Sequence, residues 1–178
     1  YGVLFARAVK RFPVPLAAGA AALGLAGIAL SAVAISRDPL DYNFRNPITN
    51  IRTFGSDPDR VRDMGVAYVN AVQAHGVAAS IKHFPGDGTE ERDQHLILGV
   101  NELTPDEWDA SFGRVYASHI ANDVEMIMAG HIALPHYQQK LNPALADRDI
   151  LPATLAPELI NGLLKTQLGF NGVVITDA

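Results

Sequence analysis

Cysteine is absent from all 178 residues of the sequence. Its absence excludes disulfides, thiolate catalysis and cysteine-ligated zinc, so any metal site would have to use histidine and carboxylate ligands. An excess of basic residues is also missing, because 14 Lys and Arg stand against 19 Asp and Glu. We therefore expect no nucleic-acid partner, since nucleic-acid binding depends on cations that neutralise phosphates.

Apolar residues, in contrast, are plentiful, at 48% of the chain, which excludes an intrinsically disordered protein. One uncharged stretch, residues 14–36, is long enough to cross a bilayer. Alanine and glycine dominate it, and they drive membrane insertion only weakly. We expect a divergent buried helix and strand there and no membrane association, with a membrane anchor as the alternative.

Three helices are predicted in the remainder of the chain. Apolar residues at helical spacing predict one that begins after Asp57 and stops at Gly76. Thr104 is a suitable N-cap for a second helix over 105–122. The third is expected over 156–168.

Short apolar runs between these helices predict buried strands over 77–81, 125–129 and 173–176. Alternation of strands and helices is typical of an α/β fold with parallel strands covered by helices. Ligands bind at the C-terminal ends of the strands in such folds. The strongest polar clusters of this sequence follow the predicted strands, so we expect the site there.

Lys82 and His83 open one such cluster, in a loop predicted over 82–96. Both side chains can donate hydrogen bonds to sugar or carboxylate oxygens. The alternative for Lys82 is a surface lysine that pairs with Glu90 or Glu91.

Asp93 and His95 lie in the same loop, one residue apart. In an extended segment their side chains leave the same face, where a carboxylate can orient an imidazole as a general acid/base near neutral pH. Spacing alone leaves open whether the two side chains meet.

Asp177 stands where the last predicted strand emerges. A carboxylate there can act as a nucleophile or stabilise an oxocarbenium-like transition state, and it can equally be a helix N-cap or a loop carboxylate. Arg52 is a planar cation in a second long loop, and its alternative partners are Asp57 and Asp59.

Imidazoles and carboxylates are numerous enough for a metal site, in particular those of His83, Asp87, Asp93 and His95. Their spacing matches no dedicated metal motif, so we expect neither a metal nor a cofactor, and a metal-dependent hydrolase is the alternative. His131 follows the strand predicted over 125–129 and is expected to line the same cleft.

Together these residues resemble family 3 glycoside hydrolases, and within that family the bacterial β-N-acetylhexosaminidases (β-N-acetylglucosaminidases). The resemblance covers residues 41–178. Five ordered blocks carry it: Asn46-Pro47-Ile48 with Arg52-Thr53-Phe54-Gly55-Ser56-Asp57-Pro58, Lys82-His83-Phe84-Pro85-Gly86-Asp87-Gly88, Asp93-Gln94-His95, Met128-Ala129-Gly130-His131-Ile132, and Leu168-Gly169-Phe170-Asn171-Gly172-Val173-Val174-Ile175-Thr176-Asp177.

The resemblance implies a (β/α)₈ barrel of the TIM type that works without a cofactor. It implies that Asp177 is the nucleophile, which attacks the anomeric carbon and forms a glycosyl-enzyme that water resolves with retention. His95 with Asp93 matches the acid/base pair of the hexosaminidase branch. The positions that hold the sugar hydroxyls in the family are matched by Arg52, Lys82 and His83.

Two positions depart from the family. The commonest form of the second block has histidine where this chain has Asp87, a change expected to affect loop shape more than chemistry. The family also has an aspartate that contacts the sugar just before the Asn-rich loop. Asp38 or Asp41 is a candidate substitute, and neither is assigned that role here.

The expected activity is the removal of terminal β-N-acetylglucosamine from carbohydrates derived from peptidoglycan or chitin. Three alternatives stay open. They are a family 3 glycosidase of the β-glucosidase type, a glycoside phosphorylase, and a non-catalytic sugar-binding or membrane-tethered remnant. No export signal is recognised, so the cytoplasm is the default location.

A barrel of this type needs about 250 residues. Residues 1–178 are therefore expected to be an incomplete N-terminal catalytic barrel domain. We expect the 178 residues alone to be poorly folded and inactive.

Overall fold

The computed structural model describes residues 40–50 and 52–177. The predictions for residues 14–36 and for Asp38 fall outside this described part. Within it, no helix combines the length and the apolar character that crossing a bilayer would need.

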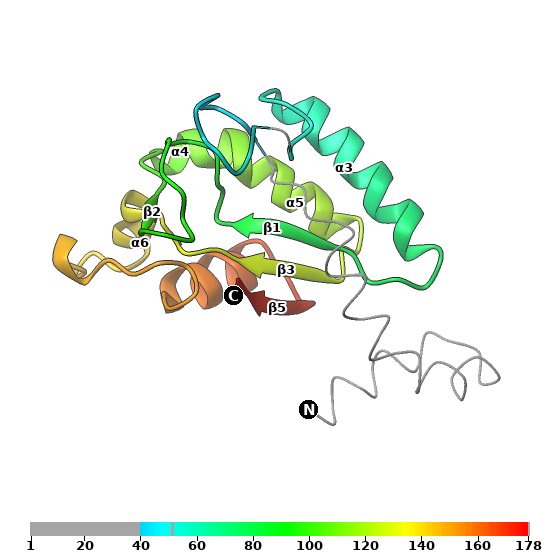
Figure 1. Cartoon of the computed structure of the whole chain (residues 1–178). Helices are drawn as coiled ribbons and strands as arrows, with labels where there is room; N and C mark the ends of the chain where they lie inside the picture. The colour runs from blue at the N-terminus through cyan, green and yellow to red at the C-terminus, as the bar shows by residue number, and fades with distance from the viewer. Residues whose placement is uncertain (1–39, 51, 178) are drawn as a thin grey trace.

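Three parallel strands form the central sheet, in the order β1-β3-β5. They are β1 (Ser80–Phe84), β3 (Met126–Ala129) and β5 (Val173–Thr176). The register places Ile127 of β3 between Ile81 and Val174 of its two neighbours. The three arrows point the same way in Figure 1, so their C-terminal ends lie at one edge of the sheet.

Helices connect and cover these strands, as the alternating pattern predicts. The helix α3 (Pro58–Gln73) precedes β1 and packs against α5 (Arg114–Ala121), which precedes β3. Both run along the same side of the sheet (Figure 1). The remaining elements are α4 (Pro105–Trp108), the π-helices η1 (Asp109–Gly113) and η3 (Glu158–Gln167), α6 (Pro135–Leu141), the 3₁₀-helix η2 (Asp147–Asp149), and the parallel pair β2 (Gly99–Val100) with β4 (Ile132–Ala133).

The predicted N-cap Thr104 is confirmed, and Asp57 caps the helix that was predicted to begin after it. Asp57 accepts a hydrogen bond from the backbone N–H of Asp59 at the start of α3. Thr104 and Glu107 form a reciprocal capping box at the start of α4. The helix predicted over 105–122 is present as α4, η1 and α5 in succession, with a π-helical segment in its middle.

The strand predicted over 77–81 is displaced, because β1 spans Ser80–Phe84 instead. Val77 is exposed, whereas Phe84 is fully buried and pairs with Ala129 of β3. Lys82 and His83 were expected to open the loop, since polar side chains usually end a buried strand. Their backbone nevertheless continues the strand, and the His83 ring is buried at the end of the sheet.

An aromatic cluster supports the turn that follows β1. The ring of Phe84 contacts Trp108 and Tyr116 edge-on, at centroid distances of 6.3 and 5.2 Å. The indole Nε1 of Trp108 donates a hydrogen bond of 2.7 Å to the carbonyl of Pro85. All three rings are fully buried, so this turn packs against the hydrophobic core.

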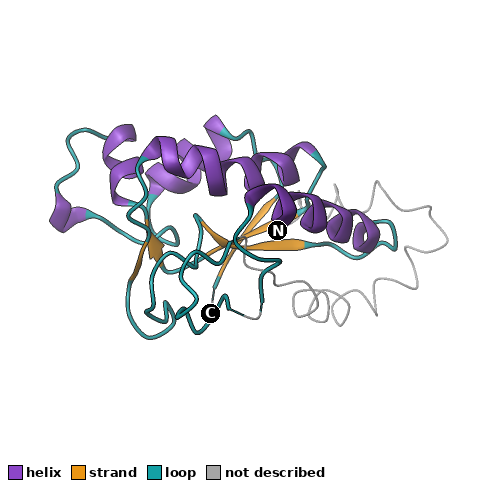
Figure 2. Cartoon of the chain, turned by 90° about the horizontal axis from the view of Figure 1, so that it is seen from above, coloured by secondary structure: helices purple, strands orange, loops and turns teal. Residues whose placement is uncertain are grey.

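Long loops gather at one end of the sheet, around the C-terminus (Figure 2). Asp177 directly follows β5, and its backbone N–H donates to the carbonyl of Ala129 at the end of β3. The backbone N–H of Gly130 in turn donates to the carbonyl of Phe84 at the end of β1. The three strand ends are thus tied together at the place where the sequence predicts the site.

Candidate active site

Two polar side chains from opposite edges of the sheet meet at these strand ends. Nε2 of His83, on β1, lies 3.3 Å from Oδ2 of Asp177, after β5. The intervening strand β3 ends at Ala129, and a Cβ atom on the next residue, Gly130, would lie only 2.7 Å from Cβ of His83. The glycine directly after the central strand therefore leaves room for the histidine side chain.

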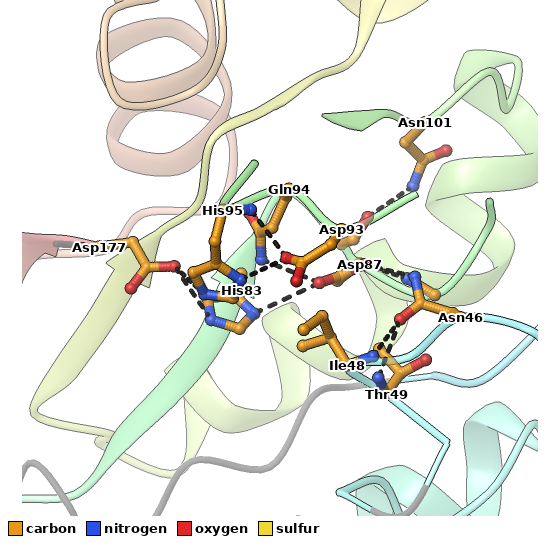
Figure 3. A network of polar contacts seen from close by, with 12 residues as sticks. Asn46, Ile48, Thr49, His83, Asp87, Asp93, Gln94, His95, Asn101 and Asp177 are labelled. Carbon is orange, nitrogen blue, oxygen red and sulfur yellow. Dashed lines mark hydrogen bonds and ion pairs between the residues drawn. The ribbon is translucent and has the colours of Figure 1, made fainter. Parts of the chain in front are cut away.

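The predicted Asp93–His95 pair does meet. Oδ1 of Asp93 lies 2.6 Å from Nδ1 of His95 and also accepts the backbone N–H of His95 at 2.9 Å. Nε2 of His95 then lies 3.2 Å from Oδ2 of Asp177 (Figure 3). The carboxylate of Asp93 thus orients the ring so that its second nitrogen faces the Asp177 carboxylate.

Asp93 stays ionised in this arrangement. Its pKa is held below the usual range chiefly by the hydrogen bond from the backbone N–H of His95. The ring and charge of His95 and the charge of Arg52 lower the pKa further, whereas burial opposes them. A carboxylate that keeps its charge is the form that can support a protonated imidazole.

A buried layer of polar groups lies behind these residues. Oδ2 of Asp87 accepts a hydrogen bond of 2.8 Å from Nε2 of Gln94 and lies 3.6 Å from Nδ1 of His83. Oδ1 of Asp87 accepts a bond of 3.0 Å from Nδ2 of Asn46. From the sequence, Gln94 and Asn46 have no individual role, and Asp87 is only a change of turn shape or a candidate metal ligand.

No periodicity in the sequence identifies Gln94. Residues 93–96 form a turn, in which the backbone N–H of Leu96 donates to the carbonyl of Asp93 at 3.0 Å, and not the extended segment that the sequence led us to expect. The inward position of Gln94 follows from its buried acceptor, Asp87, rather than from alternation along a strand.

Three groups of this site can hold a metal ion. One ligand atom each from His83, His95 and Asp177 lies within 4.8 Å of the other two. Two imidazoles and a carboxylate are a ligand set that zinc accepts. The sequence expectation of no metal stays a prediction, because the same three atoms are also suited to acid/base and nucleophilic chemistry.

The other predicted site residues take different places. Arg52 is half-buried, and its positive charge acts on Asp93. Lys82 is half-buried in β1, one residue before His83. His131 follows Gly130, and its Nδ1 lies 3.2 Å from the hydroxyl of Thr154. Contact of these three side chains with a sugar stays a prediction.

Comparison with known proteins gives the chain its relatives. A β-N-acetylglucosaminidase/β-glucosidase of Cellulomonas fimi is 58% identical over 139 residues, which are 78% of this chain and 25% of that protein. Among solved structures, a β-glucoside phosphorylase, BglX, matches with a TM-score of 0.78 and 41% identity over 85% of this chain and 28% of its own. A family 3 β-N-acetylglucosaminidase of Paenibacillus sp. str. FPU-7 matches with a TM-score of 0.69 and 32% identity, covering 81% of this chain and 26% of its own.

The chain therefore spans about a quarter of the length of these relatives. The described strands and helices are part of a TIM-type barrel, as expected. The family model for the N-terminal domain of glycosyl hydrolase family 3 matches residues 6–178, and the chain belongs to that family.

Proposed function

We propose that the whole enzyme removes terminal β-N-acetylglucosamine residues from carbohydrates by a retaining mechanism with a covalent glycosyl-enzyme. One observation carries the proposal. The carboxylate of Asp177 and the imidazole of His95 face each other at 3.2 Å, with the charged Asp93 behind the imidazole. A nucleophile and an oriented general acid are the two groups that the first chemical step needs.

In that first step, Oδ2 of Asp177 forms a bond to the anomeric carbon while the bond from that carbon to the leaving oxygen breaks. The protonated Nε2 of His95 gives its proton to the leaving oxygen, so an alcohol departs and the imidazole becomes neutral. Asp93 stabilises the protonated ring before the step and fixes its orientation throughout.

In the second step, neutral His95 takes a proton from a water molecule whose oxygen attacks the anomeric carbon. The bond between this carbon and Asp177 breaks, and the carboxylate leaves with its electron pair. Two displacements on the same carbon give net retention, and the enzyme returns to its starting protonation state.

The distance of 3.2 Å between His95 and Asp177 is too short for a substrate to react between them, so the two groups have to move apart when the substrate binds. Nucleophile and acid groups of retaining glycosidases are about 5 Å apart, because the anomeric carbon and the leaving oxygen lie between them. His95 sits on a loop and its side chain is 34% exposed, whereas Asp177 is only 12% exposed and is tied to β3 through its backbone. Movement of the exposed His95 ring, rather than of the less exposed Asp177 carboxylate, is therefore the simpler way to make room.

The sugar class rests on the relatives and on the acid/base group. The Cellulomonas fimi relative is named for activity on β-N-acetylglucosaminides and β-glucosides, and the Paenibacillus relative for the former. The Asp93–His95 pair matches the hexosaminidase branch that the sequence resembles. We place N-acetylglucosaminides first and β-glucosides second.

The proposal is tested on the full-length enzyme with 4-nitrophenyl β-N-acetylglucosaminide and 4-nitrophenyl β-glucoside. We expect the first to be turned over with the larger kcat/KM, and NMR to show the β-anomer of the free sugar as the first product. Turnover of neither glycoside, or a first product with inverted configuration, would contradict the proposal.

Phosphorolysis is the second candidate, and one feature favours it. The acid/base group is an imidazole, which does not repel a phosphate anion as a carboxylate would. The phosphorylase named above is 41% identical. If phosphate resolves the glycosyl-enzyme, the product is a sugar 1-phosphate, whose formation in phosphate buffer but not in a non-coordinating buffer separates the two reactions.

A further inference from the structure

Gln94 stands out in the loop of the acid/base pair because it alone of the three adjacent residues is buried. The side chain of His95 is 34% exposed and that of Asp93 is 27% exposed, whereas Gln94 is 3% exposed as a residue. Leu96 and Ile97, which follow, are exposed as well. The inward side chain of Gln94 is thus the main attachment of this short segment to the interior.

Gln94 bonds to Asp87, which other hydrogen bonds hold in place. Nε2 of Gln94 donates to Oδ2 of Asp87 at 2.8 Å, and Oδ1 of Asp87 accepts from Nδ2 of Asn46 and from the backbone N–H of Gly88. Asn46 also donates to the carbonyl of Glu90, in the stem of the same loop. A buried carboxyl group that accepts hydrogen bonds from several donors has little freedom to move.

The same carboxylate faces the other side of the site. Oδ2 of Asp87 is 3.6 Å from Nδ1 of His83, whose Nε2 is 3.3 Å from Asp177. The loop that carries the acid/base pair and the histidine that contacts the nucleophile therefore share one anchor. Figure 3 shows Gln94 between His95 and Asp93, with Asp87 between Gln94 and Asn46.

From this arrangement we propose that Gln94 and Asp87 form a positioning pair, which sets the imidazole of His95 against the leaving oxygen while the nucleophile stays where β5 holds it. Neither residue touches the reacting atoms in this role. The inference rests on the proposed function, because it assigns the pair to the proton-transfer half of that mechanism.

If the loop were displaced, proton transfer from His95 to the leaving oxygen would be impaired. A displacement of about 1 Å can lower a rate about a hundredfold when it misaligns a catalytic group. Asp177 does not belong to this loop, so its attack on the anomeric carbon should be unaffected. Loss of the Gln94–Asp87 bond should therefore matter in proportion to how much the leaving group needs a proton.

The test compares two substrates on the full-length enzyme. Phenyl β-N-acetylglucosaminide has a basic leaving group, phenolate, which needs a proton from the general acid. The 2,4-dinitrophenolate of the corresponding dinitrophenyl glycoside is weakly basic and departs without a proton. For Gln94→Leu we expect kcat/KM to fall about ten- to a hundredfold with the phenyl substrate and less than about threefold with the dinitrophenyl substrate.

Gln138→Leu is the matched control. Gln138 is also a buried amide, but it bonds to the backbone of Leu134 and Leu151. It should lower activity on both substrates by the same factor or not at all. If Gln94→Leu does not fold, Gln94→Met keeps the unbranched shape and replaces it.

Equal losses on the two substrates, or no loss, would overturn the positioning role. That result is distinct from failure of the proposed function, in which the wild-type enzyme would turn over neither glycoside.

Discussion

Nε2 of His95 lies 3.2 Å from Oδ2 of Asp177, although one comes from the loop after β1 and the other from the end of β5. Parallel strands make this possible, because their C-terminal ends share one edge of the sheet. Two small residues lie there, Ala129 at the end of the intervening strand β3 and Gly130 directly after it. The contact between a loop histidine and a strand-end aspartate is the relationship from which the mechanism follows.

Replacement of Asp93 by asparagine should weaken the general acid. The amide keeps the size of the side chain but removes the charge that stabilises the protonated imidazole of His95. We expect kcat/KM for a phenyl glycoside to fall by about 10²-fold, within the range of general acid catalysis. Asp149→Asn, which removes the same charge at an exposed position, is the control and should leave kcat/KM unchanged. Equal activity of the Asp93 variant and the control would refute the pairing.

Gly130→Ala tests the space at the end of β3. The added Cβ atom would lie 2.6 Å from Oε1 of Gln94 and 2.7 Å from Cβ of His83, so both residues would have to shift. Overpacking of this kind costs about 1–3 kcal/mol, and here it should also lower kcat. Steady-state kinetics with a urea titration measures both effects.

Gly162→Ala is the control for that substitution, because its Cβ would meet only Leu141 Cδ1, at 3.3 Å. It should leave kcat intact. A Gly130→Ala enzyme with normal kcat would show that the site does not depend on this packing.

The lowered pKa of buried His119 makes the stability of the folded protein depend on pH. His119 is buried on α5, with Nδ1 2.8 Å from the carbonyl of Val115, and burial lowers its pKa below the usual 6.5 against the opposing effect of hydrogen bonds to Val115 and Gly65. The unfolded chain therefore binds more protons than the folded one just below that pH. The contribution of His119 is complete above about pH 6.5 and is lost as the pH falls, by at most about 1.4 kcal/mol per pH unit.

Urea titrations of the full-length enzyme at several pH values check this expectation. His119→Gln should destabilise the protein at neutral pH and should lose less stability on acidification than the wild type does. Parallel pH dependences of the two proteins would exclude a role for His119 in acid sensitivity.

Metal ions should inhibit rather than activate. The atoms that can hold a metal, on His83, His95 and Asp177, are those that the mechanism uses. We expect a chelator to leave kcat/KM unchanged and added Zn²⁺ to inhibit in competition with the substrate. Loss of activity on chelation, restored by Zn²⁺, would instead favour a metal-dependent hydrolase.

The sequence predicts the order of strands and helices better than it predicts the strand bounds. The residue types and spacing at 93, 95 and 177 leave several roles open, and the roles of nucleophile and acid/base pair come from the resemblance to family 3 glycoside hydrolases. Both ends of β1 lie three residues later than predicted, since burial of a polar residue such as His83 depends on partners from distant segments. The role of Gln94 was missed for the same reason, as its acceptor Asp87 and the supporting Asn46 are recognisable only in three dimensions.

The identity of the nucleophile is the central claim, and covalent trapping tests it most directly. The full-length enzyme is incubated with a 5-fluoro derivative of N-acetylglucosaminyl fluoride, which slows breakdown of the glycosyl-enzyme, and the digested protein is examined by mass spectrometry. We predict one labelled peptide, with the sugar on Asp177, and no label in the Asp177→Ala enzyme. A label on any other residue, or unlabelled wild-type enzyme that still turns over the substrate, would contradict the mechanism.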